Sequence, residues 1–132
     1  MSRADEALVR RGYEAFNRGD IDAFMDLCSP EVEWHDTATV DFGAITGTDA
    51  VRAFLEAVIE PWETIRREPE EIHDLGGERF LVLFHTQGRG KESGVEVDAR
   101  GGDVLDFEEG RLVSWTAYAD RARALRAAGL ES

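Results

Sequence analysis

The sequence predicts an α+β domain in which helices pack on one face of a curved antiparallel sheet. Before Pro61, apolar residues recur mainly every three to four positions, which is typical of amphipathic helices. After Pro61 the period shortens to two, which is typical of strands with one buried face. Turn-forming segments such as "GGE" and "EEGR" separate the alternating stretches. Helices followed by strands that short turns connect indicate the α+β class.

Two helices are expected at the start of the chain. The first covers residues 4–18, because its apolar residues fall on one face. Gly19 is suited to end this helix, and Asp20 is suited to cap the next. The second helix then runs from Ile21 and ends before Pro30.

The rest of the chain predicts two more helices and most of the sheet. A third helix begins at Thr48 and ends at Pro61, and Asp120 caps a short final helix that Gly129 closes. Strands are expected over 31–36, 64–74 (interrupted by Pro69), 79–88, 94–107 and 111–119.

Length and charge limit the function. The 132 residues are expected to form one domain, 1–132, around a single core. A net charge of −13, from 28 acidic and 15 basic residues, argues against binding to nucleic acid or to anionic membranes. No apolar run is long enough to cross a membrane, and the N-terminus lacks the apolar stretch of a signal peptide. Together with the single cysteine, Cys28, this predicts a cytoplasmic protein.

The strand over 31–36 contains an unexpected carboxylate. Val32 and Trp34 alternate with Glu33 and His35, so one face of this strand should be buried. The next residue on the buried side is Asp36. It is either a functional acid that faces the interior or a strand-end residue that caps the following turn.

Three segments resemble the nuclear transport factor two-like superfamily, in its ketosteroid-isomerase and polyketide-cyclase (SnoaL-like) branch. They are "YEAFNRGDIDAFMDLCSPEVEWHD", "GTDAVRAFLEAV" and "DVLDFEEGRLVSWTAYADRARALRAAGL", and they span nearly the whole chain. The resemblance implies a cone-shaped, cystatin-like sheet around the N-terminal helices, with an apolar pocket at its open end. It also implies a homodimer formed through the outer sheet face, a hydrophobic small-molecule ligand and no cofactor.

The resemblance also implies two catalytic acids. Counting along the matched segments places the base at Asp36 and a hydrogen-bond donor at Asp103, which would together transfer a proton beside a carbonyl group. The tyrosine of the isomerase oxyanion hole falls on Gly12, while Tyr13 lies about 100° further round the helix. A steroid isomerase is therefore not expected, whereas the cyclase chemistry depends less on that tyrosine.

Two other functions remain open. The epoxide-hydrolase branch uses an Asp–Arg–Asp cluster, which Asp98, Arg100 and Asp103 offer on one strand, although a bulge expected at Gly101–Gly102 obscures which of them face inward. A non-catalytic ligand-binding or dimerisation module is the alternative from another class, and Gly12 favours it. In that case Asp36 and Asp103 would lie in solvent or in structural salt bridges, with Asp103 as a residue of the bulge beside two glycines.

Several residues are expected to line the pocket, although aromatic residues at such spacings also form ordinary cores. His85 is either ligand-facing or a hydrogen-bonded structural residue. The three histidines are dispersed, so no metal site is expected. Cys28 lies on an apolar helix stripe and is expected to be buried and inert. The predicted substrate-binding residues are Trp34, Phe54, Val58, Trp62, His85, Arg100 and Trp115.

Overall fold

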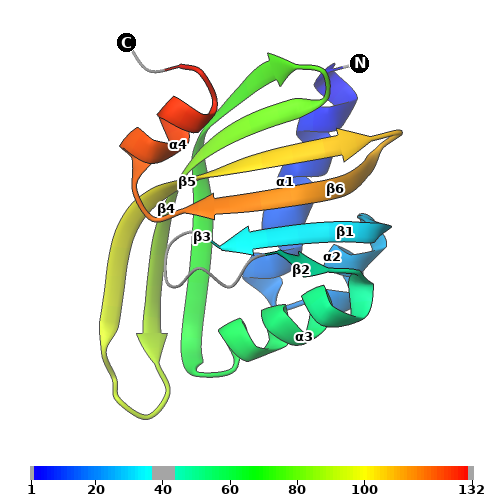
Figure 1. Cartoon of the computed structure of the whole chain (residues 1–132). Coiled ribbons are helices and arrows are strands. Elements are labelled where there is room, and N and C mark those ends of the chain that lie inside the picture. Colours follow the sequence, from blue (N-terminus) through cyan, green and yellow to red (C-terminus); the bar gives the residue numbers. More distant parts are fainter. Residues whose placement is uncertain (1, 37–43, 131–132) are drawn as a thin grey trace.

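The computed structural model describes residues 2–36 and 44–130, and these form the predicted α+β fold (Figure 1). The elements in chain order are α1 (Ser2–Arg18), α2 (Ile21–Asp26), β1 (Cys28–Asp36), β2 (Ile45–Thr46), α3 (Thr48–Ile59), β3 (Trp62–Gly76), β4 (Arg79–Gly90), β5 (Glu96–Glu108), β6 (Arg111–Tyr118) and α4 (Arg121–Ala127).

The strands form one mixed sheet in the order β2-β1-β6-β5-β4-β3. Neighbouring strands are antiparallel except β1 and β6, which run parallel. The expectation of a wholly antiparallel sheet is therefore corrected at this pair. A parallel pair needs a long connection, and here α3 and four strands separate β1 from β6 in the chain.

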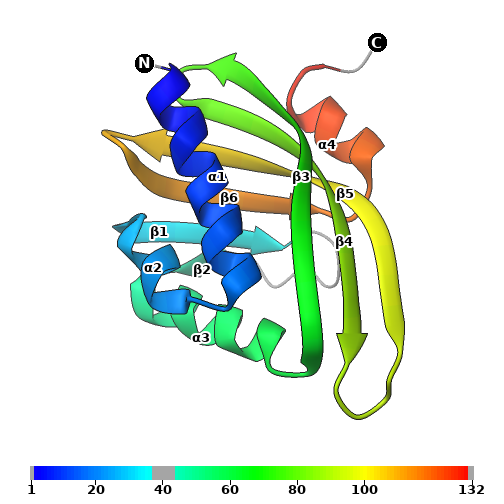
Figure 2. The same ribbon diagram turned by 180° about the vertical axis from the view of Figure 1, so that it is seen from behind.

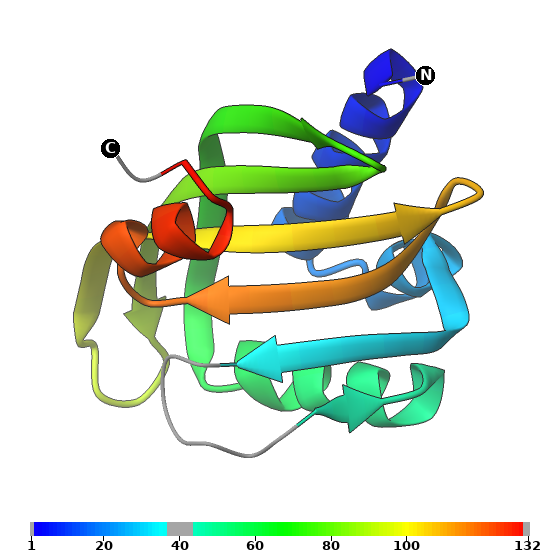
Figure 3. The ribbon, with the colours of Figure 1, turned by 45° about the horizontal axis from the view of Figure 1, so that its top comes forward.

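The sheet curves around α1, while α4 packs on its opposite face (Figures 2 and 3). The large core lies between the three N-terminal helices and the concave face of the sheet, and it includes Val9, Phe24, Val32 and Trp115. A smaller cluster lies on the outer face, where Leu81, Leu83 and Val104 pack against Ala124 of α4. The concave core determines the place of the cavity described below.

The predicted helix ends are confirmed at two aspartates and two glycines. The Asp20 carboxylate accepts a hydrogen bond from the Ala23 amide at 3.1 Å, and Asp120 caps α4 in the same way. Gly19 and Gly129 have φ angles of +69° and +76°, a left-handed conformation that favours glycine. The second helix ends earlier than expected, at Asp26, because β1 already begins at Cys28.

Pro69 does not interrupt its strand. β3 is the last strand of the sheet and pairs only with β4, so one of its edges needs no ladder hydrogen bonds. Pro69 lies opposite Phe84, and the register shifts by one residue before Glu71. This irregularity accommodates the proline within the strand, and the strand continues to Gly76.

The bulge predicted at Gly101–Gly102 is absent, because the register between β4 and β5 is regular through both glycines. The glycines instead permit close packing. A Cβ on Gly101 would lie 2.6 Å from the Tyr118 carbonyl oxygen, and one on Gly102 would lie 2.5 Å from the Ala124 Cβ. Regular alternation therefore turns Asp103 to the concave face of the sheet.

Candidate functional site: an apolar cavity above a buried carboxylate

An apolar cavity of about 300 Å³ lies between the helices and the concave face of the sheet. The helices contribute Tyr13, Phe54 and Val58 to its wall, and the sheet contributes Trp34 and Trp115. Asp36 and Arg67 are among its few charged lining residues. The cavity can therefore hold a mainly hydrophobic molecule with a small number of polar groups.

Most of the predicted site residues meet at this cavity. Asp103 is fully buried beside it and contacts two of its lining residues, Tyr13 and Arg67. Arg100 borders the cavity, but its Nε atom lies 3.4 Å from Glu70. The predicted residues that line the cavity are Trp34, Asp36, Phe54, Val58, Arg100 and Trp115.

Two predicted pocket residues lie elsewhere. His85 alternates with the inward-facing Phe84 and therefore lies on the outer face, where its Nε2 is 2.7 Å from Asp98 Oδ1. Trp62 lines a separate, more polar groove at the start of β3. Phe16 borders both this groove and the apolar cavity.

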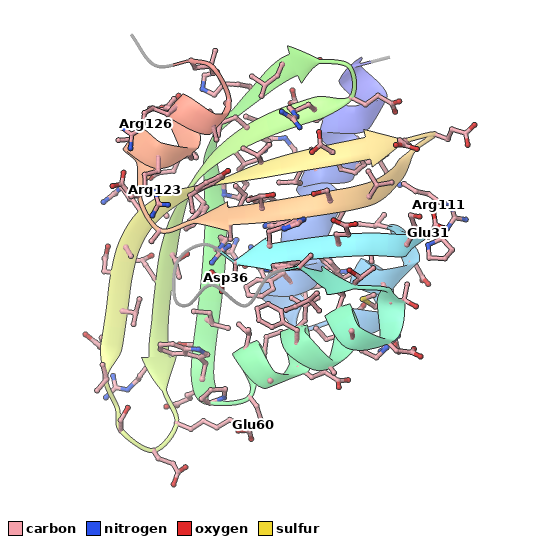
Figure 4. All side chains as sticks on the ribbon, viewed as in Figure 1. Glu31, Asp36, Glu60, Arg111, Arg123 and Arg126 are labelled. Atoms are coloured by element: carbon pink, nitrogen blue, oxygen red, sulfur yellow. The ribbon has the colours of Figure 1, made fainter. Side chains whose placement is uncertain are left out.

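The strand register places the two predicted acids on the same side of the sheet. Figure 4 shows Asp36 at the end of β1. Asp36 of β1 and Asp103 of β5 are both register partners of Ala117, on the strand between them. Adjacent strands are about 4.8 Å apart, so the two Cα atoms are separated by about 10 Å. Of the two acids, Asp36 lines the cavity, whereas Asp103 is fully buried beside it.

Tyr13 contacts Asp103 at the buried end of the site, although the count along the resemblance placed the isomerase tyrosine at Gly12. Its hydroxyl donates a hydrogen bond to Asp103 Oδ2 at 2.5 Å. Gly12 faces a different part of the core, where a Cβ would lie 3.8 Å from both Phe24 and Trp115. The aromatic hydroxyl that reaches the buried acid therefore comes from Tyr13, the residue next to Gly12.

Burial controls the ionisation of this pair. Desolvation raises the pKa of Asp103, and the positive charge of Arg67 and the hydrogen bond from Tyr13 oppose that rise without cancelling it. Burial and the neighbouring Asp103 raise the pKa of Tyr13 well above its ordinary value. Tyr13 therefore stays protonated near neutral pH and remains a hydrogen-bond donor.

Arg67 is the functional candidate that sequence reasoning missed. Its Nη1 lies 3.3 and 3.4 Å from the two oxygens of Asp103, and its Nε donates to Thr86 Oγ1 at 3.3 Å. Its guanidinium carbon lies 4.1 Å from the centre of the Phe84 ring. The sequence contained one indication of this role, because Arg67 lies two positions after Ile65 and therefore on the same, apolar face of the strand. Pro69 interrupted this alternation and made it hard to recognise.

Asn17 holds Arg67 in place through the backbone. The Asn17 side-chain amide donates to the Arg67 carbonyl at 3.0 Å, and its oxygen accepts from the Arg67 amide at 2.7 Å. Both backbone groups belong to the outer edge of β3, which no other strand covers. This pair of hydrogen bonds therefore ties the end of α1 to the strand that carries the guanidinium.

Asn17→Ala should lower the free energy of unfolding by about 1–3 kcal/mol, because two part-buried backbone groups lose their partners. Asn17→Asp is the matched control, since it keeps the oxygen that accepts from the Arg67 amide and loses only the donor. Urea unfolding should rank the stabilities as wild type, then Asn17→Asp, then Asn17→Ala. Equal stability of Asn17→Ala and wild type would show that the two hydrogen bonds contribute nothing.

Aromatic rings form the opposite wall of the cavity. Trp34 and Trp115 are stacked, with ring centres 4.9 Å apart and planes 8° from parallel. Phe54 contacts Trp34, and Tyr13 contacts Trp115, at centre distances of 5.7 and 5.1 Å. Aromatic pairs at these distances are stabilising, so this wall is a preformed surface for a flat apolar ligand.

The remaining chemical groups do not add to the site. Cys28 is buried as predicted, and burial raises the pKa of its thiol to about 12. Asp98 and Arg100 face away from Asp103, so the three residues do not form the cluster considered for an epoxide hydrolase.

Within residues 2–36 and 44–130, no group of three or more His, Cys, Asp or Glu side chains is arranged to hold a metal ion. None of the described helices combines the length and apolar character needed to cross a membrane.

The fold is that of NTF2-like and ketosteroid-isomerase-like proteins. The chain belongs to the SnoaL-like domain family, whose model matches residues 9–115. No curated protein matches the sequence.

Solved structures with the same fold include proteins of unknown function and proteins with bound small molecules. An NTF2-like protein of unknown function from Burkholderia pseudomallei K96243 is 28% identical, with a TM-score of 0.78 over 93% of this chain and 95% of that one. A hypothetical protein from Catenulispora acidiphila, in complex with trimethylamine, is 15% identical, with a TM-score of 0.77 over 93% and 92%. A Mycobacterium tuberculosis protein in complex with estradiol-17beta-hemisuccinate is also 15% identical, with a TM-score of 0.77 over 87% and 92%.

Proposed function

We propose that this protein binds a hydrophobic carbonyl compound in the apolar cavity and catalyses a cofactor-free proton transfer of the isomerase or cyclase type. The observation that carries the proposal is the pair of carboxyl groups on either side of Ala117, one in the cavity wall and one buried beneath it. Asp36 is the proposed base, and Asp103 acts through the hydroxyl of Tyr13.

The chemistry requires the two acids to be in different protonation states. Asp36, ionised, would remove a proton from the carbon beside the carbonyl group. Asp103, in the protonated form that burial favours, would donate a hydrogen bond to the Tyr13 oxygen, which reverses the direction of the bond in the structure. The Tyr13 O–H would then be available to the substrate oxygen as negative charge develops on it.

A non-catalytic binding module is the second candidate, and one observation favours it. Asp103 has no exposed surface and contacts Arg67, so it can equally be a structural group that fastens β5 to β3. The apolar cavity would still bind a small molecule in this case. The fold relatives found with trimethylamine and with an estradiol derivative support small-molecule binding in either case.

Deuterium exchange into a ketone tests the proposed reaction and separates the two candidates. The protein is incubated in D₂O with benzylacetone and with other aryl and alkyl ketones, and deuterium at the carbon beside the carbonyl is followed by NMR. Asp36→Asn should slow the exchange by about 10²-fold or more, because it removes the base. Asp98→Asn is the matched control, since Asp98 lies on the outer face beside His85 and should leave the rate unchanged.

Two results would contradict catalysis. The first is exchange no faster than with an equal concentration of free carboxylate buffer for every ketone. The second is an equal loss of rate in Asp36→Asn and Asp98→Asn, which would indicate a general effect of charge. Ketone binding without exchange, measured by calorimetry, would establish the binding module instead.

The remaining predictions concern organisation and location. We propose that residues 1–132 form one domain, that the protein is a homodimer and that it is cytoplasmic. In the structure, α4 packs against Leu81, Leu83 and Val104 and so covers part of the outer sheet face through which the dimer is expected to form. Sedimentation equilibrium would measure the oligomeric state directly.

A further inference from the structure

The guanidinium of Arg67 makes fewer hydrogen bonds than it can. Arginine has five N–H donors, and here Nε bonds Thr86 while Nη1 contacts Asp103. No hydrogen bond joins Nη2 to any residue that the structure describes. Because Arg67 lines the cavity and its side chain keeps 24% of its surface exposed, its spare donors are accessible to a ligand.

Its contact with Asp103 is also loose for an ion pair. Charge-assisted N–H···O bonds are about 2.7–2.9 Å long, whereas these two contacts are 3.3 and 3.4 Å. Tyr13 already donates to Asp103 Oδ2 at 2.5 Å. Burial also raises the pKa of Asp103, which opposes its pairing with Arg67. The long contacts with Asp103 therefore leave Arg67 able to bind a second anionic group at the edge of the apolar cavity.

The surroundings fix the orientation of this cation. The Phe84 ring lies beneath the guanidinium plane, and Asn17 holds the backbone of Arg67 at two points. A guanidinium in a fixed plane with free donors is suited to bind carboxylate or another anionic oxygen. The other cation at the cavity edge, Arg100, is directed to Glu70 and is not arranged in this way.

We propose that the natural ligand is a hydrophobic organic acid whose anionic oxygen binds Arg67 while its hydrocarbon part packs against Trp34 and Phe54. This rests on the proposed function, because it concerns the same cavity, and it specifies the class of carbonyl compound. The net charge of −13 opposes anion binding at long range, but salt screens that effect beyond about 8 Å. The preference for an acid therefore has to come from the local contact with Arg67.

Calorimetry with a matched pair of probes tests this proposal. Phenylbutanoate and its amide, phenylbutanamide, have nearly the same shape, and only the first is anionic at neutral pH. Phenylbutanoate should bind the wild-type protein at least about tenfold more tightly, which corresponds to about 1.4 kcal/mol. In the double variant Arg67→Met with Asp103→Leu, which removes both charges together, the two probes should bind equally.

The outcomes separate this inference from the proposed function. Equal or tighter binding of the amide to wild type would overturn the organic-acid ligand and leave the cavity as a site for neutral carbonyl compounds. If the double variant still bound phenylbutanoate more tightly than phenylbutanamide, the role proposed for Arg67 would be overturned. If phenylbutanoate, phenylbutanamide and benzylacetone all failed to bind, both proposals would be overturned. Arg67→Lys provides a further check, because lysine keeps the positive charge but lacks the planar set of guanidinium donors that can bind both oxygens of a carboxylate. This variant should weaken phenylbutanoate binding and leave amide binding unchanged.

Discussion

Arg67→Met should lower the free energy of unfolding by about 3 kcal/mol at about pH 8, the lower end of the range for breaking a buried ion pair. The variant removes the cation that contacts Asp103 and leaves this fully buried carboxylate with Tyr13 as its remaining donor at these distances. The lower end applies because the Arg67 side chain is partly exposed. Urea unfolding measures the change.

The loss should shrink as the pH falls. Burial raises the pKa of Asp103 above its ordinary 3.8, and removing Arg67 raises it further. The folded state then binds the proton more tightly than the unfolded state, so stability falls as pH rises from about 3.8 through the folded pKa and is constant above it. The difference between Arg67→Met and wild type should therefore be smaller at about pH 5 than at about pH 8.

The double variant Arg67→Met with Asp103→Leu supplies the control. Replacing both partners of a buried ion pair with apolar residues is often neutral, but Asp103→Leu also removes the acceptor of the buried Tyr13 hydroxyl. The double variant should therefore regain part of the stability that the single variant loses, and its stability should no longer depend on pH through Asp103. A loss in Arg67→Met that is independent of pH would contradict this account, because it would indicate lost packing on Phe84 rather than an unpaired carboxylate.

The fold could be predicted because its signals are local in the sequence. The stop at Gly19, the caps at Asp20 and Asp120, and the change of period after Pro61 each depend on residues a few positions apart. Alternation along β1 also placed Asp36 on the buried side, where it lines the cavity. Physical rules that act over one or two turns of chain were sufficient for these features.

The failures came from contacts between distant segments. The need for Gly101 and Gly102 arises from Tyr118 and Ala124, which approach from the next strand and from α4. No local rule includes those neighbours, so the two glycines were read as a bulge. Of the two interpretations of His85, the structure supports the hydrogen-bonded structural residue, because the register of β4 places His85 on the outer face beside Asp98.

The buried end of the site needed the structure most. Tyr13, Arg67 and Asp103 come from α1, β3 and β5, and up to 90 residues separate them in the chain. The family resemblance pointed to Asp103, and the same count along α1 gave Gly12 rather than Tyr13, since adjacent helix positions point about 100° apart. For Arg67 the sequence offered only its alternation with Ile65, which does not show that the side chain reaches Asp103.

Trp115→Ala should lower the free energy of unfolding by about 3–5 kcal/mol, the range for removing a buried aromatic side chain. Trp115 is 3% exposed and contacts the rings of Tyr13, Phe24 and Trp34. Trp62→Ala is the matched control, because Trp62 is half-buried in the polar groove at the start of β3 and its loss should cost only about 1 kcal/mol. Thermal and urea unfolding of the two variants give the comparison.

The same pair of variants separates the cavity wall from the groove in binding. Trp115→Ala removes one side of the stacked pair that forms the wall, so it should weaken benzylacetone binding wherever the variant remains folded. Trp62→Ala should leave that binding unchanged, since Trp62 lines the groove and not the apolar cavity. If Trp62→Ala were instead the more damaging substitution for binding, the ligand would lie in the groove, and the roles proposed for Asp36 and Arg67 would fail with that result.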